Sequence, residues 1–211
     1  MLGYFLDGGW MMLPLTICSI IWVAILIDRI RAFRVAGTAH EELRKDVNDA
    51  LDAKDVDKAI ALCEQSTGPV AATFLTGLSK FRRMKEHNKT TAEMTVTVSK
   101  AMEEYAPKAL QGLENRLSYL VLLAGISPLI GMVGTVTGMI RSFSVMVEVA
   151  GLEPGAVAGG ISEALITTAA GLLVAVPCVV VYHIFQRRIE DYTRSIEMGV
   201  ADISEFISEE G

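Results

Sequence analysis

The chain has 211 residues, 51% of them hydrophobic, and a formal net charge of −6. This balance excludes nucleic acid as a partner, because no stripe of Lys and Arg is available to neutralise phosphates. The three cysteines show no C-x-x-C spacing and no nearby histidine, which argues against a metal site or a disulfide scaffold. We find no nucleophile–base pair either, so we expect neither an enzyme nor a bound cofactor.

The first apolar run extends from Trp10 to Ile27, and arginines follow it at 29, 31 and 34. A secretory signal peptide carries its positive charge before the apolar stretch. Here the charge comes after it, so residues 10–28 are predicted to remain in the membrane as a first transmembrane helix. Cytoplasmic flanks collect Lys and Arg, which makes residues 1–9 periplasmic in this prediction.

Residues 29–116 form a long hydrophilic region that we predict to be cytoplasmic and helical. Apolar residues recur at helical spacing over 39–53 and 56–65, with Asp55 as an expected N-cap. A Ser-Thr-Gly-Pro break at 66–69 precedes a further helix through Phe81. From Thr90 the pattern predicts one amphipathic helix that continues without a stop signal into the next apolar run, with Pro107 as a point where it could bend.

Two further uncharged or nearly uncharged runs are long enough to cross about 30 Å of hydrocarbon. They predict transmembrane helices at 117–147 and 160–186, a short periplasmic link at 148–159 and a cytoplasmic tail at 187–211. The link carries Glu148 and Glu153 but no Lys or Arg, whereas basic residues flank both cytoplasmic ends. The sequence therefore predicts an all-α membrane protein with three transmembrane helices and long helical cytoplasmic extensions.

The second and third of these helices carry stripes of small residues, which allow close packing of membrane helices. Each stripe contains a hydroxyl: Thr135 lies 19 residues after Arg116, and Thr168 lies 19 residues before Arg187. At 1.5 Å per residue both are about 28 Å from the basic residues that mark the cytoplasmic side. We therefore expect the two hydroxyls to lie at one level in the membrane.

Glu163 is the one charged residue in the third apolar run. An ionisable residue at membrane depth is costly and is by default a functional hypothesis. The alternative is that Glu163 sits at the outer interface and caps the third helix, since acidic groups suit a helix N-terminus; the residues alone do not separate these readings. Arg141 is the corresponding charge in the second helix, and its long side chain is expected to snorkel to water at the outer interface.

Two segments at 126–140 (ISPLIGMVGTVTGMI) and 160–177 (GISEALITTAAGLLVAVP) closely resemble the MotA/TolQ/ExbB proton channel family, and in particular its ExbB/TolQ branch. The start at 8–15 (GGWMMLPL) and the IDRI at 27–30 are also similar to an ExbB-type start. The resemblance implies pore-lining roles for Thr135 and Thr168 and an intramembrane role for Glu163. Thr137, Thr167 and Arg141 are secondary candidates, Thr137 and Arg141 being departures from the family pattern.

The resemblance also implies partners and a location. We expect a homo-pentamer in the inner membrane of a Gram-negative bacterium, enclosing a dimer of single-helix ExbD/TolR-like subunits and acting on a TonB/TolA-like protein. Protons, rather than sodium ions, would drive this stator, while the energised process stays open. The alternative is a passive helical scaffold that is embedded in membrane lipids and recruits cytoplasmic partners.

Overall fold

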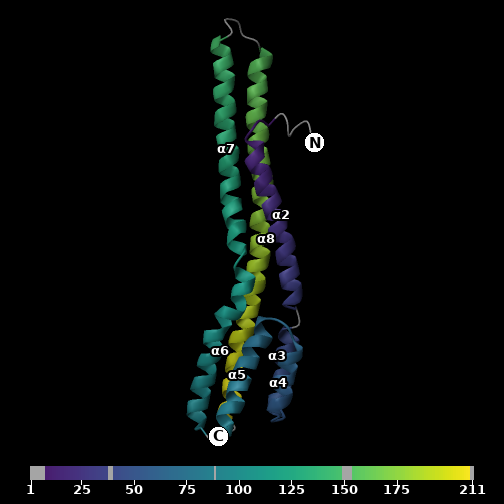
Figure 1. The fold of residues 1–211 in the computed structure, drawn as a ribbon, viewed down its shortest axis with the longest axis vertical. Helices are drawn as coiled ribbons and strands as arrows, with labels where there is room; N and C mark the ends of the chain where they lie inside the picture. Colours follow the sequence, from purple (N-terminus) through teal and green to yellow (C-terminus); the bar gives the residue numbers. More distant parts are fainter. Residues whose placement is uncertain (1–7, 38–39, 88, 149–153, 210–211) are drawn as a thin grey trace. The chain divides into compact units, whose positions relative to one another are not determined.

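The computed structural model describes residues 8–37, 40–87, 89–148 and 154–209, and every regular element in these ranges is an α-helix (Figure 1). The chain divides into two compact units. The first comprises residues 1–28 and 116–184, and the second comprises residues 29–115 and 185–211. Helices α2 (Met12–Val35) and α8 (Pro154–Glu209) contribute residues to both units.

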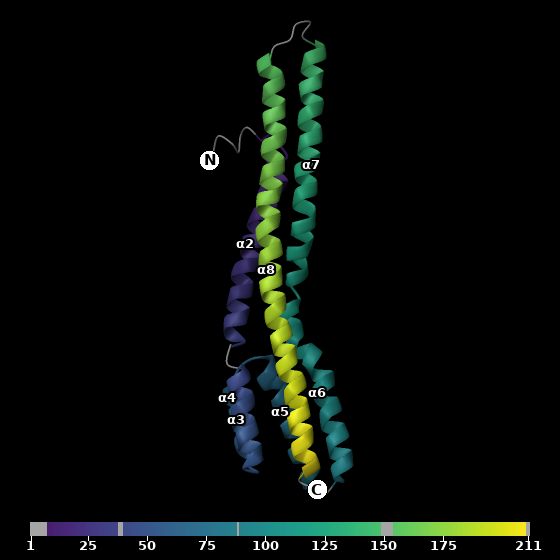
Figure 2. The same cartoon turned by 180° about the vertical axis from the view of Figure 1, so that it is seen from behind.

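The first unit consists of the first part of α2, the helix α7 (Leu117–Glu148) and the first part of α8. α7 and α8 run antiparallel and side by side, and α2 lies along this pair (Figures 1 and 2). All three helices are long and apolar enough to cross a membrane. Only 22%, 28% and 33% of their most apolar windows are buried, so most of these side chains face outward. Such an exposed apolar surface requires lipid or other subunits around it, and the protein is therefore an all-α membrane protein, as predicted.

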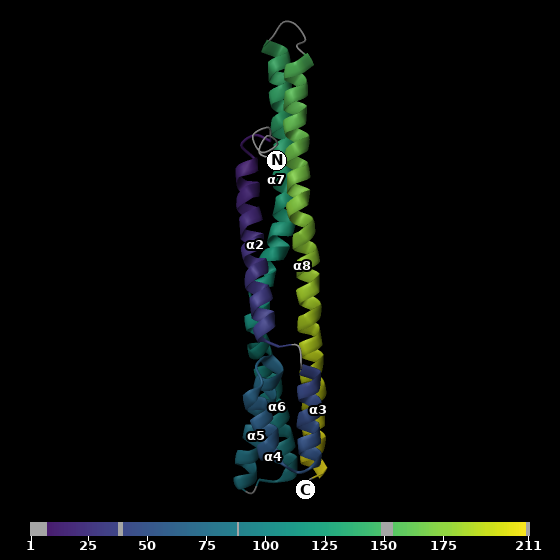
Figure 3. The same cartoon turned by 90° about the vertical axis from the view of Figure 1, so that its right-hand side faces the viewer.

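The second unit contains α3 (His40–Asp52), α4 (Val56–Gln65), α5 (Pro69–Glu86), α6 (Thr91–Glu114) and the remainder of α8 (Figure 3). Its core is apolar, and Phe81 packs edge-on against Phe206 with 5.9 Å between ring centroids. Polar contacts from α3 and α6 also hold α8: Arg44 pairs with Asp202 at 3.2 Å. Buried core side chains of this unit include Val47, Phe74, Leu78, Val98, Met102, Ile203 and Ile207.

The predicted helix at 56–65 is confirmed, since α4 has these bounds. Asp55 is its N-cap, and the Asp55 carboxylate accepts a hydrogen bond from the Lys58 backbone N–H at 2.9 Å. The predicted break at 66–69 separates α4 from α5, and α5 has Pro69 in its first turn, where the missing N–H is not needed. α5 continues beyond Phe81 to Glu86.

The prediction of an unbroken helix from Thr90 into the second apolar run is wrong. α6 ends at Glu114 and α7 begins at Leu117. The Arg29 guanidinium donates hydrogen bonds to the carbonyl oxygens of Gly112 at 3.1 Å and Leu113 at 2.8 Å. In a continuous helix the N–H groups of residues 116 and 117 would bind these two oxygens. The buried arginine therefore replaces the helical partners of the last turn and ends α6.

The link between the second and third apolar runs is shorter than predicted. α7 continues to Glu148 and α8 begins at Pro154, so residues 154–159, which we assigned to the link, are helical. Proline suits the first position of a helix, because its fixed φ is helical and the first N–H has no intrahelical acceptor. The part of the predicted link at 149–153 lies outside the described residues.

Candidate functional site

The candidate site lies where α7 and α8 approach each other most closely. A Cβ atom on Gly138 would lie 2.9 Å from the Gly160 carbonyl oxygen, and one on Gly171 would lie 2.6 Å from the Ser127 carbonyl oxygen. Both distances are too short for a side chain, so the backbones meet without one. This is the close packing that small residues permit between membrane helices. It brings the polar groups of the two helices within hydrogen-bonding distance.

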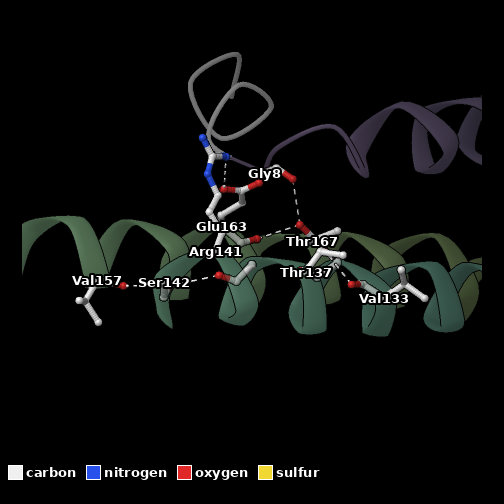
Figure 4. Close-up of polar contacts among 10 residues, drawn as sticks. Gly8, Val133, Thr137, Arg141, Ser142, Val157, Glu163 and Thr167 are labelled. Atoms are coloured by element: carbon white, nitrogen blue, oxygen red, sulfur yellow. Dashed lines mark hydrogen bonds and ion pairs between the residues drawn. The ribbon is translucent and has the colours of Figure 1, made fainter. Parts of the chain in front are cut away.

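Thr168 is the predicted site residue that joins the two helices directly. Its hydroxyl donates a hydrogen bond to the Gly131 carbonyl oxygen at 3.0 Å. The hydroxyl proton is thereby committed to α7, and the oxygen lone pairs remain as acceptors. Ser142 makes a similar bridge nearer the helix ends, because its hydroxyl is 3.1 Å from the Gly138 carbonyl and 3.3 Å from the Val157 carbonyl (Figure 4).

Thr135 and Thr137 bond to their own helix instead. The Thr135 hydroxyl donates to the Met132 carbonyl at 2.6 Å, and the Thr137 hydroxyl is 3.0 Å from the Val133 carbonyl. Because Thr168 binds Gly131, Thr135 lies four residues further along α7 than the partner of Thr168. The two hydroxyls nevertheless bind carbonyls of consecutive residues, Gly131 and Met132, which are about 1.5 Å apart along a helix. That they share one level in the membrane stays a prediction.

Glu163 forms an ion pair with Arg141, and the two oppositely charged ends are 3.3 Å apart between Nη1 and Oε2 (Figure 4). The Glu163 side chain is only 23% exposed, whereas that of Arg141 is 73% exposed. The pair joins the last third of α7 to the third turn of α8. α8 begins at Pro154, so the alternative in which Glu163 merely caps this helix is wrong.

Thr167 lies one turn after Glu163 on α8 and is buried, with 1% exposure. Its hydroxyl lies 2.9 Å from the Gly8 carbonyl oxygen and 2.8 Å from the Glu163 carbonyl oxygen (Figure 4). Gly9 follows on the same stretch, and any Cβ there would overlap the Glu163 carboxylate. The residues that lead into α2 thus lie against the polar face of α8.

The structure therefore brings Arg141, Glu163 and Thr167 together and ties Thr168 to α7, while the hydroxyls of Thr135 and Thr137 bind carbonyls of α7. A partly buried carboxylate is stabilised by a paired cation, because removing one partner leaves an uncompensated charge. Among the described residues no group of three or more His, Cys, Asp or Glu side chains converges on a common point. The cluster itself presents an ion pair between two helices and a carboxylate whose oxygens accept hydrogen bonds.

Sequence reasoning missed the Arg141–Glu163 pair and the part played by Gly8 and Gly9. A signal for the pair was present. Arg141 comes eight residues before position 149 and Glu163 ten residues after position 153, so the two lie at similar distances along the chain from the stretch between α7 and α8. In an antiparallel hairpin, positions equally far from the turn face each other. The contacts of Gly8 and Gly9 had no comparable signal, because they join residues about 150 positions apart.

Comparison with known proteins identifies the family of the chain. Residues 65–198 match the profile of the MotA/TolQ/ExbB proton channel family. The chain is 32% identical over 187 residues to the Tol-Pal system protein TolQ of Haemophilus influenzae, covering 85% of this chain and 81% of that protein. It is 31% identical over 187 residues to the biopolymer transport protein ExbB-like 1 of Synechocystis, covering 87% and 70%. A 78-residue stretch is 42% identical to the biopolymer transport protein ExbB of Salmonella typhimurium, covering 37% and 32%.

Proposed function

The chain belongs to the MotA/TolQ/ExbB proton channel family, and on that premise we propose that it is the pore-forming stator subunit of an inner-membrane motor driven by the proton-motive force. The motor would transmit energy through an ExbD/TolR-like partner to periplasmic or outer-membrane processes such as transport. The observation that carries this proposal is the Arg141–Glu163–Thr167 cluster inside an otherwise apolar hairpin. A passive scaffold would have no use for a partly buried, ion-paired carboxylate there.

The proposed orientation has the N-terminus in the periplasm and the C-terminus in the cytoplasm. Arg31 and Arg34 follow the first apolar run, and Arg187 and Arg188 follow the third. These positions would all be cytoplasmic, in keeping with the enrichment of Lys and Arg on that side. Arg116 precedes the second run on the same side and pairs with Asp28, with 2.6 Å between Nη1 and Oδ1. The second unit would then be the cytoplasmic region.

We further propose a homo-pentamer around a dimer of single-helix ExbD/TolR-like subunits, with a TonB/TolA-like protein receiving the work. One face of α7 supports the need for such neighbours. Met132, Val136 and Phe143 recur at helical spacing and are 58%, 55% and 59% exposed. In a membrane such a stripe suits a partner helix, a second subunit or lipid tails. A pore needs at least the first two of these.

The hydroxyls of Thr135 and Thr168 suggest how the wall could act on a carboxyl group of the partner. Both donate their protons to backbone carbonyls, of Met132 and Gly131 respectively. They therefore offer lone pairs to a passing group, which suits a protonated carboxylic acid that can donate and disfavours a carboxylate that can only accept. A neutral acid also crosses an apolar surface far more cheaply than a carboxylate. Protonation would thus permit the partner to move, and deprotonation would stop it.

The experiment is to replace Glu163 and Thr168 separately with Ala and to measure proton-driven flux. The complex with its single-helix partner is reconstituted into liposomes that contain a pH-sensitive dye, and a potential is imposed. We expect flux to fall by about tenfold or more in each variant, as for loss of a group that acts directly on the moving charge. Glu190→Ala and Thr193→Ala, on the same helix but outside the membrane segment, are the matched controls and should retain flux.

The result is interpretable only when assembly is intact, so each variant is first compared with the wild type by size-exclusion chromatography. Normal assembly with undiminished flux in both Glu163→Ala and Thr168→Ala would refute the motor and favour the scaffold. Replacing protons by sodium ions in the same liposomes tests the expected ion. Flux that follows the sodium gradient at constant pH would contradict the proton assignment.

A further inference from the structure

Gly9 has two properties that are separately unusual. Its φ of +66° lies in the left-handed region, which side chains disfavour. In addition, a Cβ at this position would overlap Oε1 of Glu163 and lie 2.7 Å from the carboxyl carbon. The positive φ constrains only the backbone, and asparagine could also adopt it. The second property means that any side chain at this position would force the Glu163 carboxyl group to shift.

Three parts of the first unit converge on that carboxyl group. α8 supplies Glu163, α7 supplies the Arg141 guanidinium at 3.3 Å, and the stretch before α2 supplies the bare backbone of Gly9. The neighbouring Gly8 carbonyl is fixed to the Thr167 hydroxyl at 2.9 Å, one turn from Glu163 on α8 (Figure 4). The stretch is therefore anchored to the same helix whose side chain it touches.

We propose that Gly9 is a positioning residue for Glu163. Its missing side chain lets the carboxyl group lie against the backbone and face Arg141. This inference rests on the proposed function, in which Glu163 borders the ion path. A methyl group on Gly9 displaces the carboxyl group, lengthens the 3.3 Å ion pair and leaves a partly buried charge without its cation.

The position of Gly9 in the chain adds a mechanical link. Its carbonyl oxygen accepts a hydrogen bond from the Met12 N–H at 3.2 Å, so it is part of the first turn leading into α2. A movement of α2 along α8 is thereby transmitted to the Glu163 carboxyl group through a backbone contact. The carboxyl group is held from both sides, by α7 through Arg141 and by the start of α2 through Gly9.

The test uses Gly9→Ala and Gly9→Asn in the full complex, with Gly37→Ala and Gly37→Asn as matched controls. Gly37 also has positive φ, +76°, but a Cβ there would meet only the Thr67 carbonyl oxygen at 3.7 Å. A side chain at either position would therefore strain the backbone, but only a side chain at position 9 would crowd a carboxylate. We expect flux to fall about tenfold or more in both Gly9 variants, since displacements near 1 Å can cost up to a hundredfold. Both Gly37 variants should stay within about twofold of the wild type.

A second readout depends on the contact alone and not on motor activity. Glu163→Asp shortens the side chain by one methylene group and withdraws the carboxyl group from residue 9. The double variant Gly9→Ala/Glu163→Asp should therefore unfold in detergent at a higher temperature than Gly9→Ala alone, and recover part of its flux. If Gly9→Ala fails to assemble, Gly9→Ala/Glu163→Ala should restore assembly by removing the colliding group.

The outcomes separate the two proposals. Wild-type flux and melting temperature in Gly9→Ala would overturn the positioning role, and so would an impaired Gly9→Ala that neither change at Glu163 improves. Equal losses in the Gly9 and Gly37 variants would also overturn it, because backbone strain would then explain both. If Glu163→Ala and Thr168→Ala both keep full flux, the proposed function fails, whereas the thermal rescue still decides whether Gly9 positions the carboxyl group.

Discussion

Gly171→Ala places a methyl group between α8 and α7 at their closest approach. The new Cβ would lie 2.6 Å from the Ser127 carbonyl oxygen and 3.3 Å from the Gly131 Cα. Since ordinary contacts begin near 3.4 Å, the helices must separate locally by about 0.8 Å. The Thr168–Gly131 hydrogen bond lies one turn away at 3.0 Å, and the same displacement would stretch it beyond the useful range.

The expected magnitude combines three terms. Overpacking costs about 1–3 kcal/mol, and a lost hydrogen bond costs about 0.5–1.5 kcal/mol. Replacing Gly by Ala within a helix returns about 0.5–1 kcal/mol, because the unfolded chain becomes less flexible. We therefore expect a net loss of about 0.5–4 kcal/mol in the free energy of unfolding.

The assay is unfolding of the purified protein in mixed micelles by increasing fractions of sodium dodecyl sulfate, followed by circular dichroism. Gly125→Ala is the matched control, because it lies in the same hairpin and a Cβ there meets nothing within 4 Å. It should be as stable as the wild type or slightly more stable. An unchanged midpoint for Gly171→Ala, or an equal loss for Gly125→Ala, would refute the close-packing argument.

Two further predictions concern the second unit. Burial, with a smaller contribution from Glu64, raises the pKa of the Cys63 thiol to about 12 from its ordinary 9.0. As pH rises, the thiol therefore loses its proton in the unfolded chain before it does so in the folded chain, and the free energy of unfolding should fall by up to about 1.4 kcal/mol per pH unit between pH 9 and 12. Cys63→Ala should remove this contribution to the pH dependence. The same pH dependence in Cys63→Ala and the wild type would contradict the raised pKa. Arg29→Gln removes the cation bound to the Gly112 and Leu113 carbonyls and should lower the free energy of unfolding by about 2–4 kcal/mol. The control Arg31→Gln, at an exposed position, should change the free energy of unfolding by less than about 0.5 kcal/mol. Equal effects of the two variants in chemical denaturation would show that the carbonyl contacts do not matter.

Local patterns were sufficient for most helices. The 56–65 helix and its Asp55 cap follow from apolar spacing and one side chain–backbone hydrogen bond, both of which act within a few residues. The break after α6 was not predictable in this way, because Arg29 ends that helix from more than 80 positions away in the chain. A stop signal of this kind leaves no trace in the local sequence.

The same division applies to the candidate site. Long uncharged runs identify three membrane helices, because water-free hydrocarbon accepts a backbone only as a helix over that length, and the family motifs single out Thr135, Glu163 and Thr168. The tertiary fold alone decided which residues surround Glu163. The rotation of each helix and the contact of Gly9 with α8 are set by which backbones fit together without a Cβ between them. Such fits depend on the three-dimensional shape of the backbone at the scale of ångströms, whereas the length of an apolar run can be counted directly in the sequence.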